Sequence, residues 1–458
     1  MGLSAGVAAA AAARCCRFPL LNQACVRTMG ASAQEPKLSG PAYDADTLAP
    51  EDTWIGKLDH AAFKEDIQKL GQELAAQQGP ADVAHLNKMI WWSRGCFLVG
   101  VLTMSYCINP LSIYLISLGI MSRWTIIGHH VCHGGFDKCS DGKYNRFKFG
   151  VGSLWRRLFD WLDWMLVEAW NVEHNQLHHY CLGEVHDPDL VEHNLLAVRD
   201  LQQPQWLKRV VVFVMAATWK WHYYAPNTFK MLKIHELRRV GKVPTWKGGE
   251  TVPAKLLVAP WTVDASWFFG QGPVFFRNAE FFGRVLGPFF VRQFVVLPCL
   301  AGLVFGRTAV FNSLVSLLLA EVLTNLHSFL VIVTNHAGDD LYRFDRHCKA
   351  RTATFYLRQI ISSGNFSMGT DLIDFHHGWL NYQVEHHLWP DLSMLSYQKA
   401  APLVRSICSK HGVPYIQHSV FWRLKKTVDI MTGATNMRRF PTKWEVHDDL
   451  APVDEPSQ

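Results

Sequence analysis

The chain has 458 residues, of which 49% are hydrophobic and 18% charged, and its formal net charge is +6. The charged fraction lies below the roughly 25% typical of soluble domains, which argues against an ordinary cytosolic enzyme. The mild charge, without a long Lys/Arg block, gives no indication of nucleic-acid binding, and the absence of a C-x-x-C pair argues against a cysteine–zinc site.

The N-terminal part of the chain is polar and divides into two segments. Residues 1–34 contain arginines but no acidic residue and are rich in alanine, which fits either an organelle transit peptide or a disordered leader. Residues 35–88 include one short helical stretch at 60–77 and predict a soluble arm. A main domain over 89–425 and a C-terminal tail over 426–458 complete the predicted organisation.

Four apolar segments predict an all-α integral membrane protein with two helical hairpins, at residues 90–108, 111–127, 289–305 and 309–333. Arg123 is the only charge between residues 95 and 127, and Glu321 is the only one between 309 and 333. Two hairpins place both chain ends on one side of the membrane. The basic residues of the long region 128–288 assign that side to the cytosol.

The region between the hairpins predicts helices that lie on the membrane surface. Leu154, Leu158, Trp161 and Met165 recur at helical spacing, opposite acidic residues. The apolar stretch at 210–219 is too short to span a bilayer. We therefore expect a helical cap on the cytosolic side of the four spans.

The histidines concentrate beside the apolar segments. Eight of the 22 lie between residues 129 and 193, and seven more lie between 327 and 387. The predicted topology brings their clusters to one membrane face, where imidazoles are strong ligands for iron, zinc or copper. The sequence therefore predicts a shared metal site at this face, where the clusters contribute His129, His133, His174, His178, His179, His336, His386 and His387, and Gln383 stands three residues before His386.

Spacing supports this selection of residues and excludes two other histidines. His129 and His133, like His174 and His178, are four residues apart and would share a helical face. His130 points to another face and is predicted to be no ligand. His327 falls on the side of its helix opposite His336, so it is left out as well.

Three further residues keep two interpretations each. His376 and His377 could support the ligands or simply be exposed. Glu321 could belong to a polar strip that leads from a tunnel to the metal, or it could pair with a neighbouring span.

Three boxes carry a family resemblance: His129-His130-Val131-Cys132-His133, His174-Asn175-Gln176-Leu177-His178-His179 and Gln383-Val384-Glu385-His386-His387. Together with residues 186–189 (His-Asp-Pro-Asp), they resemble the membrane fatty acid desaturase family over residues 89–425. The run from residue 380 to 390 resembles the third box of its front-end and acyl-lipid branches.

The resemblance implies a non-haem di-iron centre, with the eight box and span-end histidines as ligands and Gln383 where other branches carry a further histidine. It also implies O2-dependent desaturation of a fatty acyl chain, in an acyl-CoA or a lipid, with formation of a cis double bond. The iron would supply the oxidising power that acid–base groups lack.

Electrons are expected to come from a separate donor, because no His-Pro-Gly-Gly run marks a fused cytochrome b5 domain in residues 1–88 or after Leu388. The donor would be cytochrome b5 at the endoplasmic reticulum or ferredoxin in a plastid.

Other activities stay open at this stage. They are an acyl or lipid hydroxylase on the same scaffold, a zinc membrane hydrolase and a metal transporter. A zinc hydrolase needs about three ligands, fewer than the histidines available here. A transporter would place its ligands near the membrane midplane, whereas these histidines lie just beyond the predicted spans.

Overall fold

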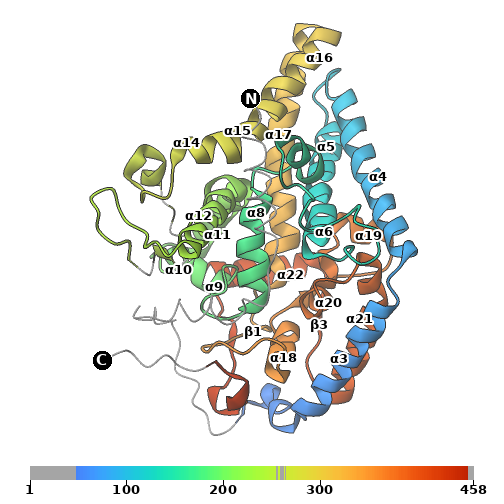
Figure 1. Cartoon of the computed structure of the whole chain (residues 1–458), viewed down its shortest axis with the longest axis vertical. Coiled ribbons are helices and arrows are strands. Elements are labelled where there is room, and N and C mark those ends of the chain that lie inside the picture. The colour runs from blue at the N-terminus through green and yellow to red at the C-terminus, as the bar shows by residue number, and fades with distance from the viewer. Residues whose placement is uncertain (1–47, 254–255, 258–262, 264, 452–458) are drawn as a thin grey trace.

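A computed structural model of the chain describes residues 48–253, 256–257, 263 and 265–451, so the predicted leader at 1–34 lies outside the described residues. The protein is mostly helical, as the sequence predicts. In Figure 1 the helices α4, α5, α16 and α17 rise together at one end, and most of the other elements gather below them. The helices are α3 (His60–Ala76), α4 (Pro80–Thr103), α5 (Pro110–Ser122), α6 (His129–His133), α7 (Leu154–Arg156), α8 (Val167–Trp170), α9 (Val191–Asn194), α10 (Leu196–Arg199), α11 (Gln205–Trp219), α12 (Ala225–Arg239), α14 (Asn278–Glu280), α15 (Gly287–Val291), α16 (Leu297–Phe305), α17 (Arg307–Ile332), α18 (Ala353–Ile361), α19 (Asp371–His376), α20 (Gln383–Leu388), α21 (Met394–His411) and α22 (Val420–Met431).

Within the described part of the chain, three continuous helical stretches are long and apolar enough to cross a membrane: Pro110–His133, Asn278–Phe305 and Arg307–Asn335. They correspond to the second, third and fourth predicted spans. The first predicted span, 90–108, falls mostly in α4, which packs along α5. α4 carries Lys88 and Arg94, so it is less apolar than the other three stretches, and it already ends at Thr103. The four-span topology therefore stays a prediction.

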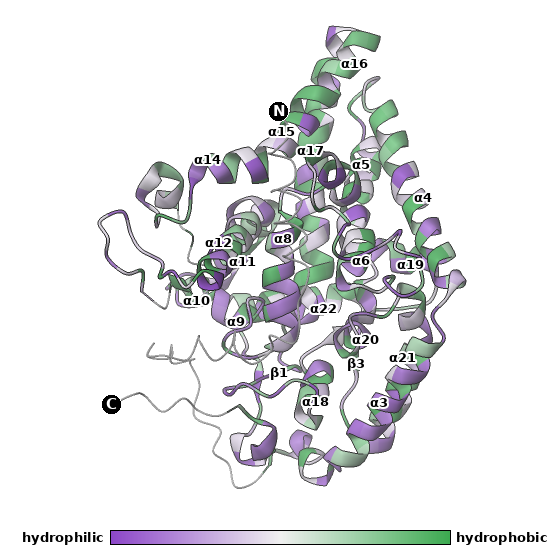
Figure 2. Cartoon of the chain, viewed as in Figure 1, coloured by the Kyte–Doolittle hydropathy of each residue, from purple (hydrophilic) through white to green (hydrophobic). Residues whose placement is uncertain are grey.

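Local chemistry explains where the two hairpins turn. At the start of α5, the Asn109 side chain accepts a hydrogen bond from the Ser112 amide at 2.8 Å, and Pro110 occupies the first helical position. Between α16 and α17 a single residue, Gly306, has φ +87°, a conformation that glycine adopts without a steric penalty. Figure 2 shows hydrophobic residues along both hairpins.

The predicted amphipathic helix near residues 154–165 is shorter than expected. It starts as α7, continues as a π-helical segment to Trp161 and ends at Leu162, whose φ is +55°. Trp155 is exposed, whereas Trp161 and Met165 are buried in the core. The chain therefore turns inward here instead of continuing along a surface. In contrast, α11 does expose apolar side chains, among them Trp206 and Phe213.

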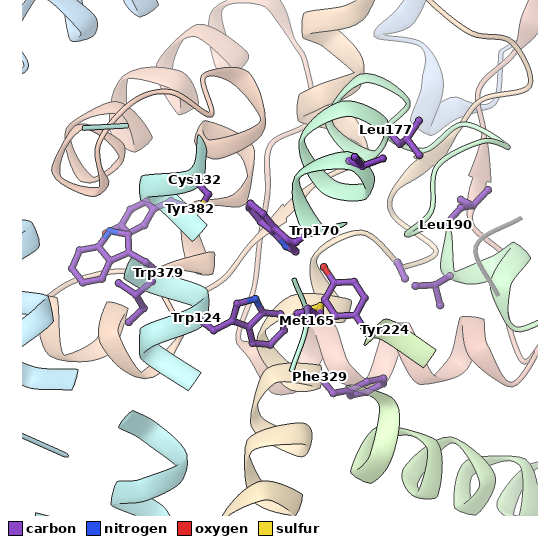
Figure 3. Close-up of a cluster of buried hydrophobic side chains, with 14 of the residues drawn as sticks. Trp124, Cys132, Met165, Trp170, Leu177, Leu190, Tyr224, Phe329, Trp379 and Tyr382 are labelled. Atoms are coloured by element: carbon purple, nitrogen blue, oxygen red, sulfur yellow. The ribbon is translucent and has the colours of Figure 1, made fainter. Parts of the chain in front are cut away.

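Four strands of two residues each form two parallel pairs. β1 (Tyr342–Arg343) pairs with β4 (Arg438–Arg439), and β2 (Gly364–Asn365) pairs with β3 (Ile416–Gln417). The first pair attaches the described part of the tail to the segment that follows α17. An apolar core rich in tryptophan lies between these elements and the long helices, and Figure 3 shows part of it.

Candidate metal centre

Four separate segments bring histidines to one buried place at the inner end of the long helices. They are α6, the π-helical segment η5 (Asn171–Leu177) with the following 3-10 turn η6 (His178–Tyr180), the residue after the end of the α17 stretch, and α20. The side chains they contribute are all buried: His129, His133, His174, His178, His179, His336, Gln383, His386 and His387.

Four of these histidines form a first group that could hold a metal ion: His129, His133, His174 and His386. One nitrogen from each lies within 4.8 Å of the others. The Nε2 atoms of His129 and His386 are 2.9 Å apart, although the two residues are 257 positions apart in the sequence. The nitrogens therefore converge on one small space.

A second group consists of His178, His336 and His387, under the same 4.8 Å limit. The Nε2 atoms of His336 and His387 are 3.2 Å apart. His179 lies between the groups. Its Nε2 is 3.3 Å from that of His174, and its ring is centred 4.4 Å from the ring of His387. The histidines therefore form two adjacent groups, with the imidazole of His179 between them.

Backbone irregularity explains how neighbouring histidines reach different groups. The second box lies on a π-helical segment followed by a 3-10 turn, where His174 and His178 stack with ring centroids 5.1 Å apart. His174 belongs to the first group and His178 to the second, and both also lie within 4.8 Å of Asp189. Single π-helical turns often occur at functional sites. His129 and His133, on the regular helix α6, stay in one group as predicted.

Several rings are held through their Nδ1 atoms, which leaves Nε2 directed at the shared space. Nδ1 of His178 is 2.8 Å from the Asp187 carboxylate. The corresponding partners of the other rings are the Ser362 carbonyl for His336, the Gln359 side chain for His387 and the Tyr397 hydroxyl for His386. Such partners fix the orientation of a ligating imidazole and tune its basicity.

Burial also sets the protonation of these rings. It lowers the pKa of His174, His179 and His387 well below the usual value, and the neighbouring imidazoles lower it further. Burial acts in the same direction on His178, but the carboxylates of Asp187 and Asp189 outweigh it and raise its pKa to about 9. Neutral imidazoles keep the lone pair that a metal ion requires, so binding of an ion at His178 would release its second proton.

The residues fit a pair of metal ions. The donor set is made of imidazoles, which suit iron as well as zinc and copper. Nε2 of His133 and Nδ1 of His179 are buried without a hydrogen-bond partner. Buried polar atoms are normally satisfied, so an atom without a partner at such a place points to a ligand. The Gln383 amide lies at the second group, with its nitrogen 3.0 Å from His336 Nε2.

The residues that the sequence excluded or left open lie outside these groups. His130 Nδ1 is 2.6 Å from the Ile126 carbonyl, and His327 Nε2 is 2.8 Å from the carbonyl of His376. His377 Nδ1 lies 3.0 Å from the Ile373 carbonyl, within its own helical turn. Glu321 pairs with a lysine of the middle region, Lys220, rather than with a neighbouring span.

Sequence analysis missed the residues that orient the ligands. Asp187 stands in the His-Asp-Pro-Asp run after the second box, so its signal was present. Ser362, Gln359 and Tyr397 lie in segments without any metal-binding pattern, and only the fold brings them to the rings.

A pocket with mainly apolar walls reaches the second group. His336 and Asp189 line its inner part, and Trp219, Tyr224, Phe329 and Val333 contribute to its walls. The exposed side chain of His222 also lines it, so the pocket connects the metal centre with the surface. Its walls fit a long apolar chain better than a polar substrate.

Buried histidine groups that could hold metal lie next to apolar helices, and the comparisons identify the family. The family model for fatty acid desaturase matches residues 108–419. The chain therefore belongs to the fatty acid desaturase family, and it is an oxidoreductase of that class.

Relatives in three organisms support this assignment. The NADPH-dependent stearoyl-CoA 9-desaturase of Mycobacterium tuberculosis is 25% identical over 78% of this chain and 79% of its own length. The Fatty acid desaturase 2-like protein FADS2B of Mus musculus is 23% identical over 81% of this chain and 67% of its own. The sn-1 linoleoyl-lipid 6-desaturase of Arthrospira platensis is 33% identical over 14% of this chain and 18% of its own. No solved structure matches the chain.

Proposed function

We propose that the protein introduces a cis double bond into a fatty acyl chain in an O2-dependent reaction, at two iron ions held by the histidine groups. The observation that carries this proposal is the meeting of two buried histidine groups with the apolar pocket at His336. An apolar chain in the pocket would lie with a carbon–carbon bond next to the metal centre.

The ligands would divide between the ions as the groups do. His129, His133, His174 and His386 would hold one ion, and His178, His336 and His387 would hold the other. His179 would serve the space between them, and Gln383 the open side of the second group. The iron pair, when bound, supplies activation of O2 and removal of hydrogen from an unactivated carbon.

The protein's own residues position the reaction and exclude water from it. Asp187 would keep His178 oriented, with the proton on Nδ1 and the lone pair of Nε2 toward the ion. Phe329 and Val333 would hold the acyl chain against the centre. In the balanced reaction the chain loses two hydrogens from adjacent carbons, and O2 takes these hydrogens, two electrons and two protons to give two molecules of water.

The electrons and the substrate carrier are separate parts of the proposal. A donor protein, cytochrome b5 or ferredoxin, would supply the electrons. The names of the relatives mention both a stearoyl-CoA and a linoleoyl-lipid substrate, so we propose an acyl-CoA or a lipid-bound acyl chain. The protein would be a multi-pass protein of the endoplasmic reticulum or a plastid membrane, with four spans and the metal cap on the cytosolic side.

Expression in a host that lacks polyunsaturated fatty acids tests the proposal. We expect new double bonds in the host lipids, mapped by mass spectrometry after derivatisation, when a cytochrome b5 or ferredoxin system is co-expressed. A variant with His336→Ala should give none. Hydroxylated acyl chains instead of new double bonds would favour the hydroxylase alternative, and unchanged lipids with every donor would refute both.

A further inference from the structure

Three charged side chains lie buried together behind the acyl pocket: Asp163, Lys220 and Glu321. The side chains of Lys220 and Glu321 are fully buried, and so is that of Asp163. Lys220 Nζ is 3.0 Å from a Glu321 oxygen and 3.7 Å from an Asp163 oxygen. We call these three residues the ion cluster. The metal centre described above uses none of them.

The ion cluster is built into the helix that leads to the metal centre. Glu321 and the pocket-wall residue Phe329 are on α17, which ends at Ile332, and a 3-10 turn that begins at the pocket-wall residue Val333 then leads to His336. Phe329 lies seven residues before His336, or roughly 10 Å along a helix axis. A change at Glu321 therefore acts on the same rigid element that carries the pocket wall.

Asn325 connects the ion cluster to the opposite wall of the pocket. Its side-chain oxygen accepts a hydrogen bond from the Lys220 amide at 3.1 Å. Its carbonyl accepts one from the Trp219 indole at 3.0 Å. Trp219 and Lys220 are consecutive, so the buried charge and the wall residue are held by one turn of the chain.

Aromatic rings also connect the ion cluster with the pocket wall. Trp219 stacks on Tyr224 with ring centroids 4.9 Å apart, and both line the pocket. Trp124 packs against Trp219 and Tyr224 at 6.2 and 5.9 Å. Lys220 Nζ in turn lies 5.6 Å from the centre of the Trp124 ring. Figure 3 shows Trp124, Tyr224 and Phe329 near one another in this layer.

Buried charges are costly unless they are paired in good geometry, and hydrophobic residues of similar volume often stabilise a fold equally well. A buried ion cluster is therefore weak evidence for a contribution to stability alone. It does fix the relative position of the elements that carry it, since moving one charge away from its partner leaves the partner unpaired. Here it fixes the Trp219 turn against α17, on two sides of the pocket.

We propose that the ion cluster of Asp163, Lys220 and Glu321 is a positioning device that sets the wall of the acyl pocket and thereby the carbon–carbon bond that lies at the metal centre. Lys220, Glu321 and Asp163 act through Trp219 and Asn325 and do not touch the substrate. The inference rests on the proposed function, because it specifies which acyl bond reacts and which chain lengths fit.

The test compares a charge-free variant with wild type. Asp163→Asn, Lys220→Met and Glu321→Gln are combined, so that no buried charge is left without a partner. Asn325→Leu is the second variant, since it removes the side-chain hydrogen bond to the Lys220 amide and keeps the charges. Thr324→Val is the matched control, because Thr324 bonds Ser117 of α5 on another side of the same helix.

Two measurements are made on each metal-loaded protein: the distribution of double-bond positions in the products, and the affinity for free fatty acids of increasing chain length. A single methylene in a hydrophobic pocket changes discrimination roughly tenfold, so we expect the ratio of positional isomers and the preferred chain length to shift by about that factor in both variants. Thr324→Val should keep the wild-type ratio and preference.

Each other outcome has a definite meaning. An unchanged isomer ratio and chain-length profile in a variant that retains its metal overturns the inference. If the charge-free protein does not fold, the Asn325→Leu protein decides by the same criteria. If wild type makes no double bond, the proposed function fails, and the chain-length profile alone then decides whether the ion cluster shapes the pocket.

Discussion

His178 differs from the other imidazoles of the centre in its partner. It faces a buried carboxylate, Asp187, whereas the corresponding nitrogens of His336 and His387 face neutral groups. Asp187 also accepts hydrogen bonds from the Gly183 and Asp189 amides, so its position is fixed by the backbone. A fixed carboxylate raises the basicity of the ring and hence its strength as a ligand.

Asp187→Asn should therefore weaken metal binding without unfolding the protein. The amide can still accept from the Gly183 amide, but it lacks the charge that supports His178. We expect the affinity for iron to fall about 10–100-fold, the effect typical of losing such a partner. Competition with a coloured chelator measures it. Asp66→Asn is the control, because Asp66 pairs with Lys410 and His411 away from the centre, and an equal effect of both changes would refute the role of Asp187.

At this scale the sequence predicts which histidines cluster better than it predicts their surroundings. The spacing of these histidines, as in His129 and His133, follows from local helix geometry, which a sequence pattern reflects. The orienting groups Gln359 and Tyr397 depend on how α18 and α21 pack, and no local pattern encodes that. The same applies to the pairing of Glu321, whose partner Lys220 lies about a hundred residues earlier in the chain.

At the scale of elements, helix α3 of the N-terminal arm supports the third histidine box. Gly71 on α3 lies so close to the Trp389 indole that an added Cβ would be 2.3 Å from its Nε1. Trp389 directly follows α20, which carries His386 and His387. The arm, which the sequence predicts to be soluble with one helical stretch at 60–77, thus packs directly behind the centre.

Gly71→Ala should accordingly disturb the metal centre through Trp389. Overpacking of this kind costs typically about 1–3 kcal/mol, so we expect a lower unfolding temperature and a loss of bound iron. Thermal unfolding and metal analysis of the same preparation measure both. Gly95→Ala is the matched control, since Gly95 is also helical and an added Cβ there meets nothing within 4 Å. Normal iron content in Gly71→Ala would contradict the coupling.

Element boundaries show where sequence patterns stop being sufficient. The hairpin turns at Asn109-Pro110 and Gly306 are predicted correctly, because their residue types require a turn. The amphipathic stretch after Leu154 is mispredicted in length. Its periodicity continues past Leu162, but buried contacts of Trp161 and Met165 draw the chain inward, and tertiary packing overrides the pattern.

On the scale of the whole molecule, the metal centre joins segments that are far apart in the chain. The first group alone spans His129 to His386, and the second spans His178 to His387. Metal binding therefore connects the helices, the middle region and the C-terminal part. A ligand that binds only the folded protein stabilises it, by about 4 kcal/mol at a thousandfold excess over Kd.

Removal of the metal should therefore lower the unfolding temperature of the whole protein in one transition. We expect this shift after treatment with a strong chelator, and its reversal when ferrous iron is added back. Scanning fluorimetry in detergent measures it. An unfolding temperature that stays the same while the metal is lost would show that the histidine groups are already stable without ions.

The predicted membrane topology can be tested through native cysteines. Cys107 is exposed between α4 and α5, on the side that the four-span prediction places opposite the cap, whereas Cys139 follows α6 on the cap side. In sealed cytosol-side-out vesicles, a membrane-impermeant thiol reagent should label Cys139 and spare Cys107 until the membrane is opened. Labelling is read by peptide mass spectrometry. Early labelling of Cys107 would contradict the prediction.

The central claim is that two histidine groups hold two iron ions. The most direct test is metal analysis of the purified wild-type protein, expressed with iron and zinc both available, by inductively coupled plasma mass spectrometry against protein concentration. The account predicts two irons per chain in the wild-type protein. It predicts one iron or none in the double variant that carries His178→Ala and His387→Ala. A single zinc per chain, unchanged in that variant, would contradict it.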